Sequence, residues 1–135
     1  MTALPSGLPE RVADDEELSR FLTQSNQYGA MGAKAASFLP NPKPRNTSVF
    51  RGTDFAVLRR TFEASRTDGR TAKAVAVIVA RAVRAVGLEV MAVEPPPAHA
   101  NVEGWPWSDV DPDLQKARQL ELAGRLAGDS RLVRL

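Results

Sequence analysis

The feature that most constrains the fold is an unbroken alanine- and valine-rich run, TAKAVAVIVARAVRAVG, at residues 71–87. The spacing of its valines at three and four residues predicts a helix with one apolar side, and Gly87 stands where a left-handed helix end is expected. We therefore expect one long helix here. Its apolar side would be formed by Val75, Val79, Val83 and Val86.

Six further elements follow from local patterns. Capping residues and apolar spacing predict helices at 14–22 (DDEELSRFL, capped by Asp14), at 53–62 (capped by Thr53 or Asp54) and at 112–128 (capped by Asp111, with Pro112 first). Branched and aromatic residues predict strands at 47–51 (TSVFR) and 88–93 (LEVMAV), and an edge strand at 131–135 (RLVRL).

The resulting order is helix, strand, helix, helix, strand, helix, strand. Strands separated by helices favour right-handed crossovers and parallel pairing. The expected fold is therefore α/β (or α+β), a small, partly parallel three-stranded sheet with about four helices in a single domain over residues 1–135. Residues 1–12 are expected to form a flexible tail and residues 23–46 a long irregular segment.

Composition sets limits on the class of protein. Hydrophobic residues make up 43% and charged residues 25%, and the net charge is +2, which are typical of a globular chain and indicate no polyanion partner by themselves. The chain has no cysteine, no run of about 18 apolar residues and no secretory start, so we expect a cytoplasmic bacterial protein. One histidine without cysteine cannot make a zinc site, and no metal or cofactor is expected.

The segment PPPAHANVEGWPW, residues 95–107, concentrates unusual side chains, since it holds the only histidine and both tryptophans. If strands 47–51 and 88–93 ran parallel, their carboxyl ends would bring Arg51 beside this segment. Arg51 would then hold a carboxylate or phosphate, His99 would exchange a proton, and Asn101 would donate and accept hydrogen bonds.

Trp105 and Trp107 would offer flat faces to a ligand or partner, and Asp54 is a candidate charge partner of Arg51. Structural roles compete with each of these hypotheses. A single loop histidine often bonds a backbone group, and tryptophans between prolines often cover a core.

The middle of the chain is basic, and a surface there would contact phosphates. The alternative is a solvated face with intramolecular ion pairs. The candidate phosphate contacts are Arg59, Arg60, Arg70, Lys73, Arg81 and Arg84.

Three segments, AASFLPNP, SVFR (48–51) and PPAHANVEGWP (96–106), carry a resemblance. The chain resembles a group of short bacterial proteins that share SVFR and PP-x-HAN-[IV]-x-GWP segments, over about Leu18 to Leu126. The group brings no known activity, cofactor or partner. The resemblance implies a shared site or contact surface whose motif positions are Arg51, His99, Asn101, Gly104, Trp105 and Pro106.

Three functions remain as hypotheses. The first is an accessory protein that contacts protein partners through the HANVEGWPW loop and Arg51. The second is a small enzyme or ligand-binding protein for a phosphorylated or nucleotide-like molecule, using Arg51, His99 and Asn101. The third is nucleic-acid binding through residues 59–84. The residues leave open whether the protein is an enzyme, and its oligomeric state.

Overall fold

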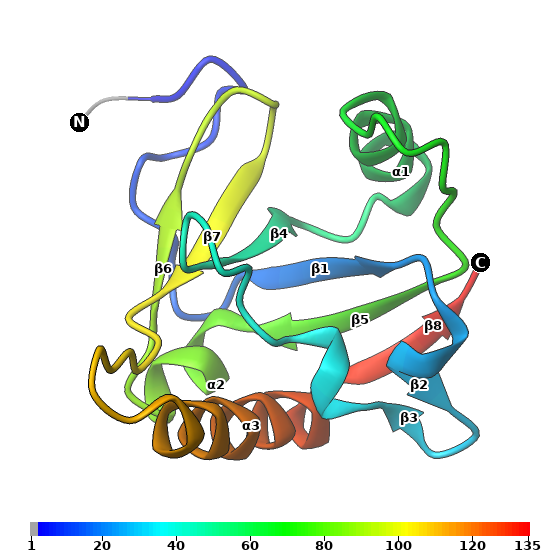
Figure 1. Cartoon of the computed structure of the whole chain (residues 1–135). Helices are drawn as coiled ribbons and strands as arrows, with labels where there is room; N and C mark the ends of the chain where they lie inside the picture. The colour runs from blue at the N-terminus through cyan, green and yellow to red at the C-terminus, as the bar shows by residue number, and fades with distance from the viewer. Residues whose placement is uncertain (1–2) are drawn as a thin grey trace.

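The computed structural model describes residues 3–135 as a twisted antiparallel sheet with helices on both faces (Figure 1). The sheet has six strands in the order β6-β7-β4-β1-β5-β8, and each neighbouring pair is antiparallel. A second, two-stranded sheet joins β2 and β3. The strands are β1 (Glu17–Leu22), β2 (Tyr28–Gly29), β3 (Gly32–Ala33), β4 (Thr47–Arg51), β5 (Ala74–Val79), β6 (Glu89–Ala92), β7 (His99–Glu103) and β8 (Arg131–Arg134).

Three α-helices lie within the described residues: α1 (Phe55–Ala64), α2 (Ala80–Ala85) and α3 (Pro112–Asp129). Two short 3-10 turns, η1 (Ser25–Gln27) and η2 (Ala35–Ser37), lie in the segment expected to be irregular. In Figure 1, α2 and α3 lie below the sheet, whereas α1 lies above it at one end. The expected partly parallel three-stranded sheet with about four helices is therefore wrong.

The largest correction concerns residues 71–87. They do not form one helix, because Ala74–Val79 is the β5 strand and α2 begins directly after it at Ala80. Residues of β5 alternate between the two faces, with Ile78 in the main core and Val75 and Val77 in the smaller core under α1. An apolar strand buried on both faces has no polar alternation, so its sequence imitates a buried helix.

The expected helix at 14–22 is also a strand. β1 pairs with β5 along its whole length and places Leu18 and Leu22 in the main core and Phe21 in the core under α1. The histidine segment differs in the same way, since residues 99–103 form β7 rather than a loop. β7 lies between β4 and β6, so those two strands are not paired with each other.

Other elements agree with the local patterns. The strands β4, β6 and β8 and the helices α1 and α3 are confirmed within a few residues at their ends. Asp111 caps α3 by accepting a hydrogen bond from Leu114 N at 2.9 Å, and Pro112 follows it. Gly87 has a positive φ of 90° just after α2, as its position predicted.

The two sheet faces differ in how much is covered. The main core includes Phe38, Val49, Val102 and Leu126 and lies between the sheet and the layer of α2, α3 and η2. On the other face α1 packs over β1, β4 and β5, where the Phe21 and Phe62 rings stack at 5.2 Å between centroids. Met91 and Val93 remain 52% and 41% exposed, so much of the β6 end of that face stays open.

Candidate functional site

A polar pocket of about 380 Å³ lies on the α1 face, beside the region that α1 covers. We call it the polar pocket. Ser48 reaches it from β4 and His99 from β7, and Phe50 and Phe62 form its apolar wall. The remaining lining residues are Arg20, Asn41, Ser65, Arg66, Thr67, Asp68 and Pro96.

Ser48 and His99 are directly hydrogen-bonded. The distance from Ser48 Oγ to His99 Nε2 is 2.6 Å, and that from His99 Nδ1 to the Val93 carbonyl oxygen is 2.8 Å. The ring also meets Phe50 edge-on, with 5.5 Å between ring centroids. The only histidine of the chain is therefore held on three sides, and one of its nitrogens faces a serine hydroxyl.

Arg20 supplies a cation that lines the same pocket. Its Nε donates to the Ser37 carbonyl and its Nη1 to the Ser48 carbonyl, each at 2.9 Å. The β1–β4 pairing ends at Ser19 and Phe50, one residue before Arg20 in β1. No carboxylate of residues 3–135 forms an ion pair with it. Burial, and then the nearby charge of Arg66, lowers the pKa of Arg20 to about 10, where it is still protonated at neutral pH.

Arg66 contributes a second cation, and it is partly neutralised. Its guanidinium lies 5.0 Å from the centre of the Phe62 ring and pairs with Asp68. Hydrogen bonds from the Arg66 side chain and the Arg70 backbone lower the pKa of Asp68 to about 2. With Arg20 unpaired, the pocket has a positive balance at neutral pH.

Arg51 lies on the opposite face. Residues of a strand alternate, so Ser48 and Phe50 face the polar pocket and Arg51 faces away from it. Its guanidinium donates hydrogen bonds to both carboxylate oxygens of Glu16, at 2.8 and 2.9 Å, and to the Pro9 carbonyl at 2.7 Å. The structure thus brings Arg51 and His99 to neighbouring strands but separates their side chains by the thickness of the sheet.

Glu16, which is partly exposed, is the charge partner of buried Arg51, a role that the sequence hypothesis gave to Asp54. Burial raises the pKa of Glu16, but hydrogen bonds from the Arg51 side chain and the Ala13 amide outweigh that effect and lower it overall. Asp54 is exposed before α1, and its side chain makes no capping hydrogen bond.

The other residues singled out in the histidine segment have different environments. Asn101 is opposite Ser48 in the β4–β7 register and shares the face of His99, although it does not line the polar pocket. Trp105 is 4% exposed in the main core and donates to the Val102 carbonyl at 3.2 Å. Trp107 packs against the same core, and Arg45 lies 4.8 Å over its ring. Its ring nitrogen is buried and has no hydrogen-bond partner among residues 3–135.

The candidate phosphate contacts are distributed over α1, the loop between α1 and β5, and α2. Several have intramolecular partners: Arg59 bonds Glu63 and the Ala72 carbonyl, and Arg70 lies 3.8 Å from Asp68. Arg84 bonds both Asp14 and Glu89. Arg60, Lys73 and Arg81 are exposed.

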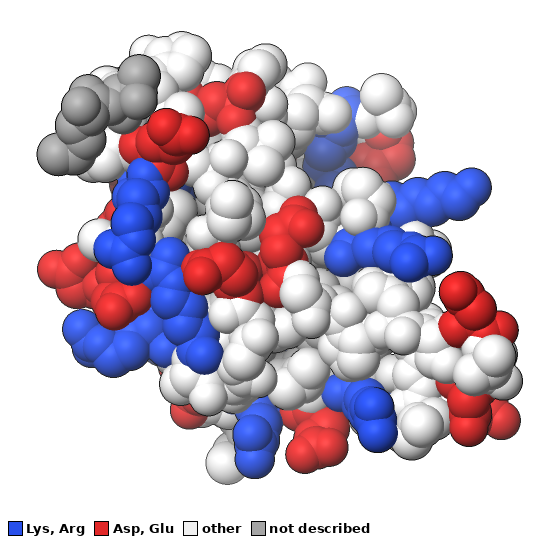
Figure 2. All heavy atoms as spheres, turned by 90° about the vertical axis from the view of Figure 1, so that its left-hand side faces the viewer, with Lys and Arg blue, Asp and Glu red and all other residues white. Residues whose placement is uncertain are grey.

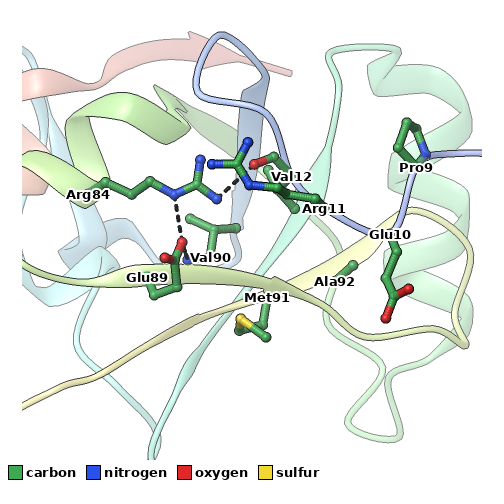
Figure 3. Close-up of a pocket in the computed structure, with 9 residues that line it drawn as sticks. All are labelled: Pro9, Glu10, Arg11, Val12, Arg84, Glu89, Val90, Met91 and Ala92. Carbon is green, nitrogen blue, oxygen red and sulfur yellow. Dashed lines mark hydrogen bonds and ion pairs between the residues drawn. The ribbon is translucent and has the colours of Figure 1, made fainter. Parts of the chain in front are cut away.

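A second hollow, of about 480 Å³, lies beside β6, which is an edge strand of the six-stranded sheet. We call it the edge groove. Figure 3 shows Arg84 reaching from α2 to Glu89 at the start of β6 and to the backbone of Val12 in the N-terminal segment. Basic and acidic side chains are interleaved on this side of the molecule (Figure 2).

Of the residues that line the polar pocket, the sequence hypotheses named His99 and missed the others, among them Arg20, Ser48 and Arg66. Ser48 had a usable signal, because alternation along TSVFR already places it on the opposite face from Arg51. No sequence pattern pointed to Arg20, because the spacing of its segment matched a helix. Its bonding partners, Ser37 and Ser48, come from the distant elements η2 and β4.

Within residues 3–135 there is no cluster of histidine, aspartate and glutamate side chains suited to a metal ion. The helices of that same part of the chain are too short or too polar to span a bilayer. No family description, curated protein or solved structure matches this chain.

Proposed function

We propose that the protein binds a small anionic molecule, bearing a phosphate or carboxylate group, in the polar pocket. The observation that carries this proposal is Arg20. A buried cation without a counter-ion is costly, and an anionic ligand would supply the missing charge. The guanidinium is held in place by two backbone carbonyls, which bind it without neutralising it.

The rest of the pocket supports the same ligand class. The Arg66 guanidinium and the hydroxyl-bearing Thr67 line it and offer further donors to an oxyanion. Phe50 and Phe62 give the ligand an apolar wall. The volume of about 380 Å³ lies at the small end of the range of roughly 300–1,000 Å³ common for ligand pockets.

Calorimetric titration with inorganic phosphate and glycerol 3-phosphate tests this function. We expect saturable binding that Arg66→Gln weakens about tenfold or more, because a hydrogen bond to a charged group contributes roughly 1.5–3 kcal/mol. Arg70→Gln is the matched control, since Arg70 also lies near Asp68 but does not line the pocket. Equal affinities for the two variants, or no saturation with either ligand, would contradict the proposal.

Arg20→Lys tests the role of the Arg20 guanidinium more directly than Arg66→Gln does. A lysine keeps the positive charge but cannot bond the Ser37 and Ser48 carbonyls and an oxyanion in one fixed plane. We expect the affinity for phosphate to fall more than in Arg66→Gln, while circular dichroism shows that the sheet remains folded. Unchanged phosphate affinity in Arg20→Lys would remove Arg20 from the site.

A contact surface for a protein partner is the second candidate function, and β6 favours it. The hydrogen bond from Val93 N to the His99 carbonyl sets the antiparallel alternation, so Val90 and Ala92 direct their backbone groups outward. Glu89 already bonds the Val90 amide at 2.8 Å, which leaves the outward groups of Ala92 for an extended segment of a partner.

Exposed Met91 is the residue that tests this surface. Met91→Glu would weaken association with a protein partner that the unchanged protein binds, whereas Met31→Glu, at a fully exposed position on the β2–β3 hairpin, would not. Equal binding by both variants would exclude β6 as the contact strand. Nucleic-acid binding has less support, because Arg59, Arg70 and Arg84 have intramolecular acidic partners.

A further inference from the structure

The Ser48–His99 pair has the proton arrangement of an activated nucleophile. The Val93 carbonyl can only accept a hydrogen bond, so the proton of the neutral imidazole is on Nδ1. Nε2 is then an acceptor, and the 2.6 Å contact is a hydrogen bond donated by the Ser48 hydroxyl. In this arrangement the histidine can take the hydroxyl proton when the serine attacks.

Both side chains are fixed by the sheet before any ligand arrives. Ser48 is the second residue of β4, and His99 begins β7 and pairs with Phe50. Val93, whose carbonyl bonds the His99 ring, also pairs with His99 through the backbone, because Val93 N donates to the His99 carbonyl at 3.0 Å. A nucleophile and base held this way lose little conformational freedom in the reaction.

Positive charge lies next to the serine. Arg20 bonds the backbone carbonyl of Ser48 itself, and Arg66 lines the same pocket. Guanidinium groups can stabilise the negative charge that develops on a carbonyl oxygen under nucleophilic attack. They would also orient a substrate that carries an anionic group of its own.

We propose that Ser48 is the nucleophile, and His99 the general base, of an esterase acting on acyl esters that carry a negatively charged group. This inference rests on the proposed anion site. The partner of His99 Nδ1 is a carbonyl rather than a carboxylate, so an imidazolium is stabilised less than in a complete triad. Esters with a good alcohol leaving group therefore fit this site better than amides.

The reaction would take two steps. Ser48 Oγ bonds to the ester carbonyl carbon while its proton passes to His99 Nε2, and the bond to the alcohol oxygen breaks as that oxygen takes the proton. A water molecule then attacks the acyl-serine, again giving a proton to His99. The carboxylic acid leaves, and the proton returns to Ser48.

Covalent labelling with a fluorophosphonate probe, read by intact mass and peptide mapping, tests the nucleophile. We expect the label on the tryptic peptide of residues 46–51, which contains Ser48, and its loss in Ser48→Ala. Ser65→Ala is the matched control, because Ser65 also lines the pocket but bonds the Phe62 carbonyl, and it should label normally. Labelling of Ser48→Ala at the unmodified rate would overturn the inference.

Hydrolysis of the mono-4-nitrophenyl ester of succinic acid tests the base and the charge preference. We expect His99→Gln to lower kcat by about 100-fold or more, the usual contribution of general base catalysis. The uncharged 4-nitrophenyl butyrate should show a lower kcat/KM. A His99→Gln variant as active as the unchanged protein would overturn the role of the base.

Phosphate titration of the same preparations separates the two proposals. Phosphate binding without labelling of Ser48 would overturn the esterase and leave the anion site standing. Labelling of Ser48 without phosphate binding and without preference for the charged ester would instead overturn the anion site and the substrate class derived from it.

Discussion

Arg20 and Arg51 are two arginines with opposite electrostatic surroundings. Arg51 is 4% exposed and has a bidentate carboxylate partner, so its charge is neutralised within the fold. Within the described part of the chain Arg20 bonds only carbonyls, so its charge is available to a ligand. The difference explains why Arg51, the more conspicuous residue in the sequence, supports the structure whereas Arg20 lines the candidate site.

Glu16→Gln should destabilise the fold strongly at neutral pH. Removing one partner of a buried pair costs roughly 3–5 kcal/mol, and the partial exposure of Glu16 places the expected loss near the lower end, at about 3 kcal/mol. Urea unfolding measures it. Glu17→Gln is the control, since its ion pair with Arg131 is exposed and should cost less than about 1 kcal/mol.

The same pair predicts a pH dependence. Because the pKa of folded Glu16 lies below its ordinary value of 4.5, the carboxylate stabilises the fold above that pH, and its contribution is lost as the pH falls through the lowered pKa. The Tm difference between the unchanged protein and Glu16→Gln should therefore narrow below pH 4.5. A difference that stays constant down to acid unfolding would show that the ion pair is not its source.

At the scale of elements, three end signals were correct, whereas Asp14 was wrongly expected to cap a helix where β1 lies. Asp111, Pro112 and Gly87 act locally, through capping, a preset φ and a left-handed turn, and each lies where it was expected. Apolar spacing misassigned β1 and β5, because Leu18, Phe21 and Leu22 match a helical stripe as well as a two-sided strand.

Asp111→Ala should lower the free energy of unfolding by about 1 kcal/mol, the usual contribution of a helix cap. The lost interaction is the hydrogen bond from Leu114 N to the Asp111 side chain. Asp109→Ala, two residues earlier in an exposed loop position, should leave stability unchanged. The Tm values of the two variants are measured by thermal unfolding. Equal Tm values would show that the Asp111 cap contributes nothing measurable to stability.

At the scale of the whole molecule, β8 protects the most apolar strand. β5 reads AVAVIV without a charge, and β8 pairs with its outer side at Ala74–Val77. An uncovered strand of this composition is prone to pair with other chains. The last strand in the sequence, β8, is thus the edge strand that covers the most apolar strand of the sheet.

Deleting residues 130–135 should cause self-association, because the outer backbone groups of β5 lose their partners. Size-exclusion chromatography with light scattering would detect dimers or larger species. Arg131→Ala is the control, since it removes the exposed ion pair with Glu17 but keeps the strand. A monomeric truncated protein with intact secondary structure would contradict this role of β8.

The sequence by itself determined α1, α3 and the strands β4, β6 and β8, because caps, prolines and branched residues act on their own backbone. Tertiary structure alone decided that β1, β5 and β7 are strands and that β7 lies between β4 and β6. These choices depend on hydrogen bonds and burial supplied by distant segments, such as the β1–β5 pairing. For the same reason His99 was recognisable from the sequence, whereas its Ser48 and Arg20 neighbours required the folded chain.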